Sequence, residues 1–96
     1  MLVLVSYDVS TVTQEGRGRL RRVAKACLDY GQRVQKSVFE CLVDPEQWAR
    51  LRLRLLSEIN PVTDSLRFYF LGRNWRGHVE HHGAHATADL EGPLIV

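Results

Sequence analysis

The alternation of apolar and polar positions over the first half of the chain predicts a strand, a helix and a second strand. Residues 1–7 form a short apolar run with valine at alternate positions, and the turn-forming Asp8 follows, which is typical of a strand buried on both faces. Apolar residues then recur at helical spacing over 14–30, where Gly31 provides a stop. Residues 33–43 are rich in β-forming side chains and predict one further strand.

The pattern of the second half predicts a capped helix and two more strands. Asp44 is expected to cap a helix over 45–59, which begins at a proline and stops before a second proline. Residues 65–72 alternate, with leucine and phenylalanine on one face and arginine, tyrosine and leucine on the other, and therefore predict a strand. Residues 78–82 fit a fourth strand at the edge of the sheet.

These elements fit an α+β domain of the ferredoxin-like plan, β-α-β-β-α-β, with residues 1–96 as a single domain. In that plan two helices cover one face of a four-stranded, mainly antiparallel sheet, and the other face stays open. The apolar tail Leu94, Ile95 and Val96 has no place in the predicted elements. Because an open sheet face and an unplaced apolar tail must both be kept from water, we expect a homodimer.

Length and composition agree with one folded domain outside the membrane. Of the 96 residues 45% are hydrophobic and 25% are charged, which is ordinary for a globular protein. No apolar run approaches the roughly 20 residues of a membrane-spanning helix, and residues 1–8 do not resemble a secretory leader. We therefore expect a cytoplasmic protein without a membrane partner, in which Cys27 and Cys41 are reduced core residues.

The basic residues are concentrated in one stretch. Of 13 basic residues seven lie between positions 15 and 36, against only Glu15 and Asp29. Most of them are arginine, whose planar fork matches phosphate, so a phosphate-rich partner is one interpretation. A solvated helix face explains the same charges equally well.

Asp8 is the most informative candidate for chemistry. A carboxylate at the end of a buried strand can hold a hard cation such as Mg²⁺, which prefers oxygen ligands. One carboxylate per chain supplies few ligands for a cation, but two-fold symmetry would bring a second Asp8 to the same ion. The alternative is that Asp8 caps the following turn through its side chain, which its position alone favours.

The four histidines are confined to residues 78–85. His81 and His85 have the i, i+4 spacing that places two imidazoles on one face of a helix, so a zinc or nickel site is conceivable. The segment contains a glycine and shows no clear helical pattern, which favours an exposed edge instead. No phosphate-binding glycine loop or nucleophile elbow occurs in the sequence.

Several segments taken together resemble a known family. Tyr7-Asp8-Val9 ends the first strand, and residues 31–41 read Gly-Gln-Arg-Val-Gln-Lys-Ser-Val-Phe-Glu-Cys. Residues 66–72 read Leu-Arg-Phe-Tyr-Phe-Leu-Gly, and residues 91–96 read Glu-Gly-Pro-Leu-Ile-Val. Nearly end to end, the chain resembles the small CRISPR-associated adaptation protein, the partner of the CRISPR integrase that is often described as an endoribonuclease. The closing segment resembles the type I-C branch.

The resemblance implies a symmetric catalytic site. In the family, a ferredoxin-like homodimer brings Tyr7 and Asp8 of each subunit together near the two-fold axis. Asp8 matches the catalytic, metal-binding carboxylate, with Mg²⁺ or Mn²⁺ as the ion, and Tyr7 belongs to the same catalytic motif and interface. Leu94, Ile95 and Val96 would form a short extra C-terminal strand that crosses to the partner's sheet.

The resemblance also implies a nucleic-acid surface. Arg33 and Phe39 match an arginine and a phenylalanine of the family that are linked to substrate handling. Arg17 and Arg19 lie where the family carries basic residues, and Arg21 extends the same basic stretch. We expect these five side chains to contact nucleic acid.

Three functions remain open at this stage. The first is a metal-dependent endonuclease of RNA or DNA that acts in spacer acquisition. The second is a non-enzymatic adaptor that binds duplex DNA through phosphate contacts and bridges integrase dimers. The third is an RNA-cleaving toxin of the same fold. Arginine contacts to phosphate do not distinguish duplex DNA from single-stranded RNA, so the substrate is also open.

Overall fold

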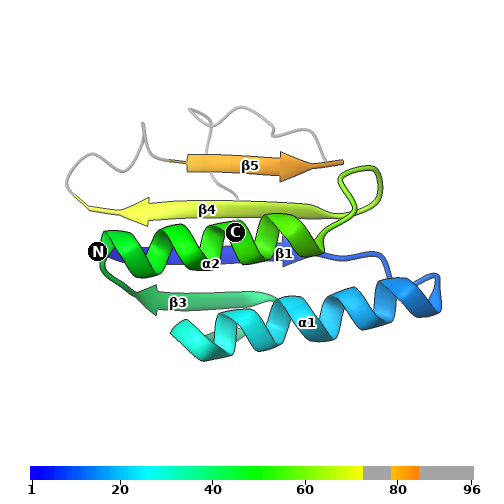
Figure 1. Ribbon diagram of the computed structural model, residues 1–96, viewed down its shortest axis with the longest axis horizontal. Helices are drawn as coiled ribbons and strands as arrows, with labels where there is room; N and C mark the ends of the chain where they lie inside the picture. Colours follow the sequence, from blue (N-terminus) through cyan, green and yellow to red (C-terminus); the bar gives the residue numbers. More distant parts are fainter. Residues whose placement is uncertain (73–78, 85–96) are drawn as a thin grey trace.

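The computed structural model describes residues 1–72 and 79–84 of the chain. The helices and strands, in chain order, are β1 (Leu2–Asp8), α1 (Gln14–Tyr30), β2 (Gln32–Gln35), β3 (Val38–Leu42), α2 (Pro45–Glu58), β4 (Ser65–Leu71) and β5 (Val79–Gly83). The strands form one antiparallel sheet in the order β2-β3-β1-β4-β5, with β1 at its centre. Both helices lie over the same face of this sheet (Figure 1). The α+β, ferredoxin-like prediction is therefore confirmed.

Local hydrogen bonds explain where both helices begin. The Thr13 hydroxyl accepts a hydrogen bond from the Gly16 amide at 3.0 Å and so caps α1. At the start of α2 the Asp44 carboxylate accepts from the Gln47 amide at 2.7 Å, and the Gln47 side chain accepts from the Asp44 amide at 2.9 Å. The cap predicted at Asp44 is confirmed.

The single strand predicted over residues 33–43 is wrong, because this segment is a hairpin. β2 and β3 pair in antiparallel fashion around a turn at residues 36–37, and the register shifts between Arg33 and Gln35. The flanking residues all favour strands, and Lys36 and Ser37 are not strong turn formers, so the sequence pattern did not reveal the turn. The hairpin supplies the adjacent pair of strands that the predicted plan requires.

The edge strand predicted near residue 80 is present as β5, which pairs with β4. With β2 and β3 separate, the sheet has five strands in the described residues instead of the predicted four. The extra strand expected at 94–96 lies outside the described residues. Neither helix of the described chain is long and apolar enough to cross a membrane.

The core lies between the helices and the covered face of the sheet. Fully buried Val5, Phe39 and Phe68 of the sheet belong to the same cluster as Leu51 and Leu55 of α2. The indole of Trp48 meets the rings of Phe68 and Phe70 edge-on, with centroids 4.8 and 5.4 Å apart.

Cys27 and Cys41 are both free thiols in this core, as predicted. Burial raises the pKa of the Cys27 thiol to about 12 and that of Cys41 to about 11. Both thiols therefore stay protonated near neutral pH.

The open face of the sheet changes in character from one end to the other. Residues paired across neighbouring strands share a face, so Leu42, Leu2 and Leu71 form an apolar row at one end. Leu42 is 78% exposed and Leu71 is 42% exposed. At the other end Asp8 pairs with Ser65. The open face is therefore apolar at one end and polar at the other.

Candidate metal and nucleic-acid site

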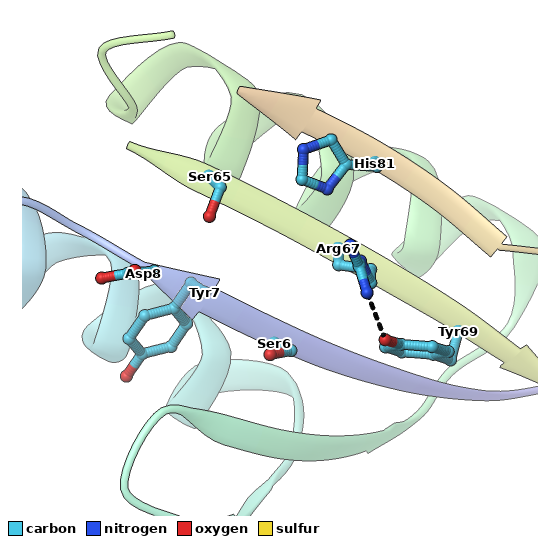
Figure 2. A pocket seen from close by; sticks show the side chains of 7 residues that line it. All are labelled: Ser6, Tyr7, Asp8, Ser65, Arg67, Tyr69 and His81. Atoms are coloured by element: carbon cyan, nitrogen blue, oxygen red, sulfur yellow. Dashed lines mark hydrogen bonds between the residues drawn. The ribbon is translucent and has the colours of Figure 1, made fainter. Parts of the chain in front are cut away.

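Asp8 lies at the polar end of the open face, as the last residue of the central strand, and its side chain is exposed. Beside it is a pocket of about 210 Å³ that Figure 2 shows from close by. The lining residues come from β1, β4 and β5 and are Ser6, Tyr7, Asp8, Ser65, Arg67, Tyr69 and His81. A carboxylate, two serines, an arginine and a histidine therefore surround one small cavity.

The turn that follows Asp8 is held by a different aspartate. The amide of Ser10 donates to Oδ1 of Asp64 at 3.0 Å, and the amide of Asn60 donates to Oδ2 at 2.9 Å. The side chain of Asp64 is completely buried. The alternative in which Asp8 caps this turn loses its main support, because Asp64 accepts from the Ser10 amide.

Arg19, predicted to contact nucleic acid, forms an ion pair with Asp64. Its Nε lies 2.8 Å from Oδ2, and its side chain is 15% exposed. Burial would raise the pKa of Asp64, but the hydrogen bonds from Arg19, the two backbone amides and the Thr63 hydroxyl lower it to about 2. In this structure the guanidinium of Arg19 therefore neutralises the buried Asp64 carboxylate and stabilises the fold.

Sequence reasoning missed Asp64. Its partners Arg19 and Ser10 are 45 and 54 positions away in the sequence. Aspartate is also a common residue in the loop that precedes a strand. The local sequence around Asp64 gives no signal of this role.

Tyr7, Arg33 and Phe39 meet on the helix-covered side of the sheet. The Tyr7 and Phe39 rings stack with centroids 6.1 Å apart, and the Arg33 guanidinium lies 5.0 Å from the centre of the Phe39 ring. Burial raises the pKa of Tyr7, and a hydrogen bond from Arg33 offsets part of this rise. Tyr7 therefore remains protonated near neutral pH, where its hydroxyl can act as a donor.

Tyr7 and Asp8 point to opposite faces, because neighbouring residues of a strand alternate. Tyr7 is 5% exposed, and Figure 2 shows its ring pointing away from Ser65 and His81. Its predicted parts in catalysis and in the dimer interface stay predictions, and its ring contributes to the core of one subunit.

The basic stretch of α1 divides into paired and unpaired side chains. Arg22 lies 2.6 Å from Glu58, and Lys25 lies 2.7 Å from Asp29. Arg17 and Arg21 are exposed, and no carboxylate of the described residues pairs with either; Arg17 donates to the carbonyl of Thr11 at 3.3 Å. The ion-paired Arg22 and Lys25 therefore fit a solvated helix face, and Arg17 and Arg21 remain the candidates for phosphate contact.

The histidines do not share one surface. His82 lies on the helix-covered side, where its Nε2 is 2.5 Å from Glu80, which also binds Arg52 of α2. His81 lines the pocket on the open face. The idea that His81 belongs to one face of a helix is wrong, because it lies in strand β5. His78 and His85 lie outside the described residues.

The donors beside Asp8 suit a hard cation but do not complete a site. The Asp8 carboxylate and the serine hydroxyls of the pocket are oxygen donors of the kind that Mg²⁺ accepts. Within residues 1–72 and 79–84, no three His, Cys, Asp or Glu side chains gather closely enough to hold a metal. A second carboxylate from another subunit, or the oxygens of a phosphate, would have to complete the coordination.

Comparison with known proteins identifies a family and close relatives. The family model "CRISPR associated protein Cas2" matches residues 1–79. The chain is 67% identical, over all of both chains, to a protein of Chlorobaculum tepidum named CRISPR-associated endoribonuclease Cas2. It is 58% identical, over 99% of both chains, to a protein of Halalkalibacterium halodurans named CRISPR-associated endonuclease Cas2.

A solved structure resembles this chain in sequence and in fold. The crystal structure of Streptococcus pyogenes Cas2 at pH 6.5 superimposes with a TM-score of 0.70 at 59% identity. The match covers 83% of this chain and 96% of that one.

Proposed function

The chain belongs to the Cas2 family of CRISPR-associated proteins, and from this premise we propose that it is a metal-dependent endonuclease acting in CRISPR adaptation. The observation that carries the proposal is the exposed Asp8 at the end of the central strand, beside a pocket that also holds Arg67. A carboxylate to hold a cation and an arginine to hold a phosphate are the two elements that phosphodiester hydrolysis needs most. The relatives named endoribonuclease and endonuclease support the same chemistry.

The active form is a homodimer in this proposal. The apolar row of Leu2, Leu42 and Leu71 gives a second copy a surface to cover, and Asp8 lies on the same open face. Two Asp8 carboxylates would then hold one Mg²⁺ or Mn²⁺, which a single carboxylate holds poorly. When bound, the ion would lower the pKa of a water molecule and offset charge on the phosphate.

The other residues bind and orient the nucleic acid. Arg17, Arg21 and Arg33 are exposed guanidinium groups that can contact backbone phosphates. Phe39 is buried and therefore acts through Arg33, which lies over its ring. Arg19 acts through Asp64 by fixing the turn after Asp8.

The adaptor function remains a second candidate, because the described residues offer only one carboxylate per chain beside the pocket. In that case the dimer bridges two CRISPR integrase dimers and binds duplex DNA through the same arginines. A cleavage test on single-stranded RNA and duplex DNA decides both between nuclease and adaptor and which of the two is the substrate of the nuclease.

The toxin alternative predicts an antitoxin gene beside the coding gene, whereas adaptation predicts an integrase gene and a repeat array.

The test compares wild type with Asp8→Asn on labelled single-stranded RNA and duplex DNA, with Mg²⁺ or with EDTA. We expect metal-dependent cleavage of one of the two substrates by the wild type. Cleavage by Asp8→Asn should fall by about a hundredfold or more, because the group that holds the cation is lost, while nucleic-acid binding persists.

Glu46→Gln is the matched control, since this exposed carboxylate lies on α2, away from the open face. It should cleave as the wild type does. Cleavage that continues in EDTA, or that Asp8→Asn retains, would contradict the nuclease. A folded dimer that binds duplex DNA without cutting either substrate would establish the adaptor.

A further inference from the structure

Arg67 is distinguished among the arginines by where it lies and by what it contacts. It is half-buried on the open face, between Ser6 of β1 and His81 of β5 in the register of the sheet. Arg19, Arg22, Arg52 and Arg54 each have a carboxylate partner. In the described part of the chain no carboxylate lies within ion-pair distance of Arg67, although partly buried charges are usually paired.

The guanidinium of Arg67 is held in place by its neighbour on the same strand face. Nη1 of Arg67 donates to the hydroxyl oxygen of Tyr69 at 3.1 Å, and the guanidinium carbon lies 6.0 Å from the centre of the Tyr69 ring (Figure 2). This contact uses one of the five N–H donors of the side chain. The remaining donors are oriented beforehand, which reduces the entropy lost when a ligand binds.

Charge and size together indicate what the pocket accepts. Arg67 lines the same cavity as Asp8, so the cavity carries one cation beside the carboxylate that would hold a metal. A volume of about 210 Å³ is below the roughly 300–1,000 Å³ of a typical small-molecule site. It therefore suits one phosphodiester unit of a strand that continues outside the pocket.

We propose that Arg67, oriented by Tyr69, binds a backbone phosphate of the nucleic-acid strand beside Asp8. This deepens the proposed function, because it places the strand at the carboxylate, but binding at Arg67 does not require cleavage. The Arg67 subsite is separate from the exposed arginines of α1, which lie on the helix layer and not on the open face (Figure 1).

The test measures binding without metal, so that it is independent of catalysis. The full-length protein is titrated into labelled single-stranded RNA and into labelled duplex DNA in EDTA at several salt concentrations, with fluorescence anisotropy as the readout. Arg67→Met should raise Kd about tenfold or more, because a charge-assisted contact is lost. The slope of log K against log salt should fall by roughly one phosphate contact, about 0.7 to 0.9.

Two further variants separate charge from orientation. Arg67→Lys keeps the cation and should recover part of the affinity and the full salt slope. Tyr69→Phe keeps the ring but removes the oxygen that accepts from Arg67, so it should weaken binding without changing the slope. Arg50→Met is the control, since Arg50 is exposed on α2 and, within residues 1–72 and 79–84, forms an ion pair with Glu46 alone; its Kd should equal that of the wild type.

The outcomes are distinguishable from failure of the nuclease. A folded Arg67→Met variant with unchanged Kd and salt slope overturns the subsite. So does an Arg67→Met variant whose weaker binding is explained by dissociation of the dimer, measured as a lower mass in solution. If Arg67→Met does not fold, a Tyr69→Phe variant that binds like the wild type overturns it. If the wild type cuts neither substrate but Arg67→Met binds nucleic acid more weakly than the wild type, the nuclease is overturned and the subsite is supported.

Discussion

At the scale of single residues, the buried carboxylate of Asp64 holds the turn that follows Asp8, although Asp64 does not line the pocket. Its carboxylate accepts from the amides of Ser10 and Asn60, from Thr63 and from Arg19. These contacts connect the turn after Asp8, the helix α1 and the loop before β4. A buried carboxylate is tolerated because all of these donors satisfy it.

Asp64 should make the protein sensitive to acid. Its folded-state pKa of about 2 lies below the ordinary value of 3.8, so the charged form is favoured in the folded state. This stabilisation is complete above about pH 4 and is lost as the pH falls toward 2. We expect the free energy of unfolding, measured by urea titration, to fall over this window by roughly 1–2 kcal/mol from this group.

Asp64→Asn removes the titrating group and should destabilise the protein at pH 7 by about 2–3 kcal/mol. The same variant should lose less stability than the wild type between pH 4 and pH 2. Glu46→Gln, which changes an exposed carboxylate, should follow the wild type at both pH values. Parallel acid profiles for wild type and Asp64→Asn would show that other carboxylates cause the acid sensitivity.

At the scale of elements, the first turn of α1 lies close to the turn that follows Asp8. A side-chain carbon at Gly16 would overlap the carbonyl oxygen of Ser10, whereas one at Gly18 would meet mainly the flexible end of Arg22 at 3.1 Å. Both glycines are buried within the helix. Of these two glycines, only Gly16 is required by a close approach of two backbones.

The two glycines should therefore respond oppositely to alanine. Gly18→Ala should stabilise the protein by up to about 0.5–1 kcal/mol, because alanine favours a helix and Arg22 can move. Gly16→Ala should destabilise it by about 1–3 kcal/mol, because the Ser10 carbonyl cannot be displaced without moving the turn. Thermal unfolding of both variants checks this, and equal effects would mean that helix propensity alone decides.

At the scale of the whole molecule, the open face of the sheet carries both the proposed dimer contact and the proposed active site. The row of Leu2, Leu42 and Leu71 lies at one end, and Asp8 and Ser65 lie at the other. The row next to Asp8 contains Ser6, Arg67 and His81. Association through this face would place the apolar row in contact and leave the pocket near the boundary between the two copies.

Leu42→Glu should disrupt this association. Light scattering coupled to size exclusion should give about twice the chain mass of 11.0 kDa for the wild type and a lower mass for the variant. Leu53→Glu is the matched control, because Leu53 is 70% exposed on α2, in the helix layer. A dimer that survives Leu42→Glu would show that the contact uses another surface.

The sequence by itself determined the types of the elements and the position of Asp8. Periodicity and caps are local properties, so the helices that begin at Gln14 and Pro45, and the strand that ends at Asp8, follow from neighbouring residues. The alternation of side chains in that strand also places Tyr7 and Asp8 on opposite faces, although their shared motif suggested a single site.

Only the tertiary structure decided which distant side chains meet. The pairing of Arg19 with Asp64 spans 45 positions, and the pocket brings Asp8 of β1 together with Arg67 of β4 and His81 of β5. These contacts depend on strand order and on the register of each pair, and a register shifted by two residues would keep the same faces while changing which side chains meet. Whether an arginine neutralises a buried carboxylate or faces an open pocket is therefore set by the assembled sheet, because its local sequence is compatible with both.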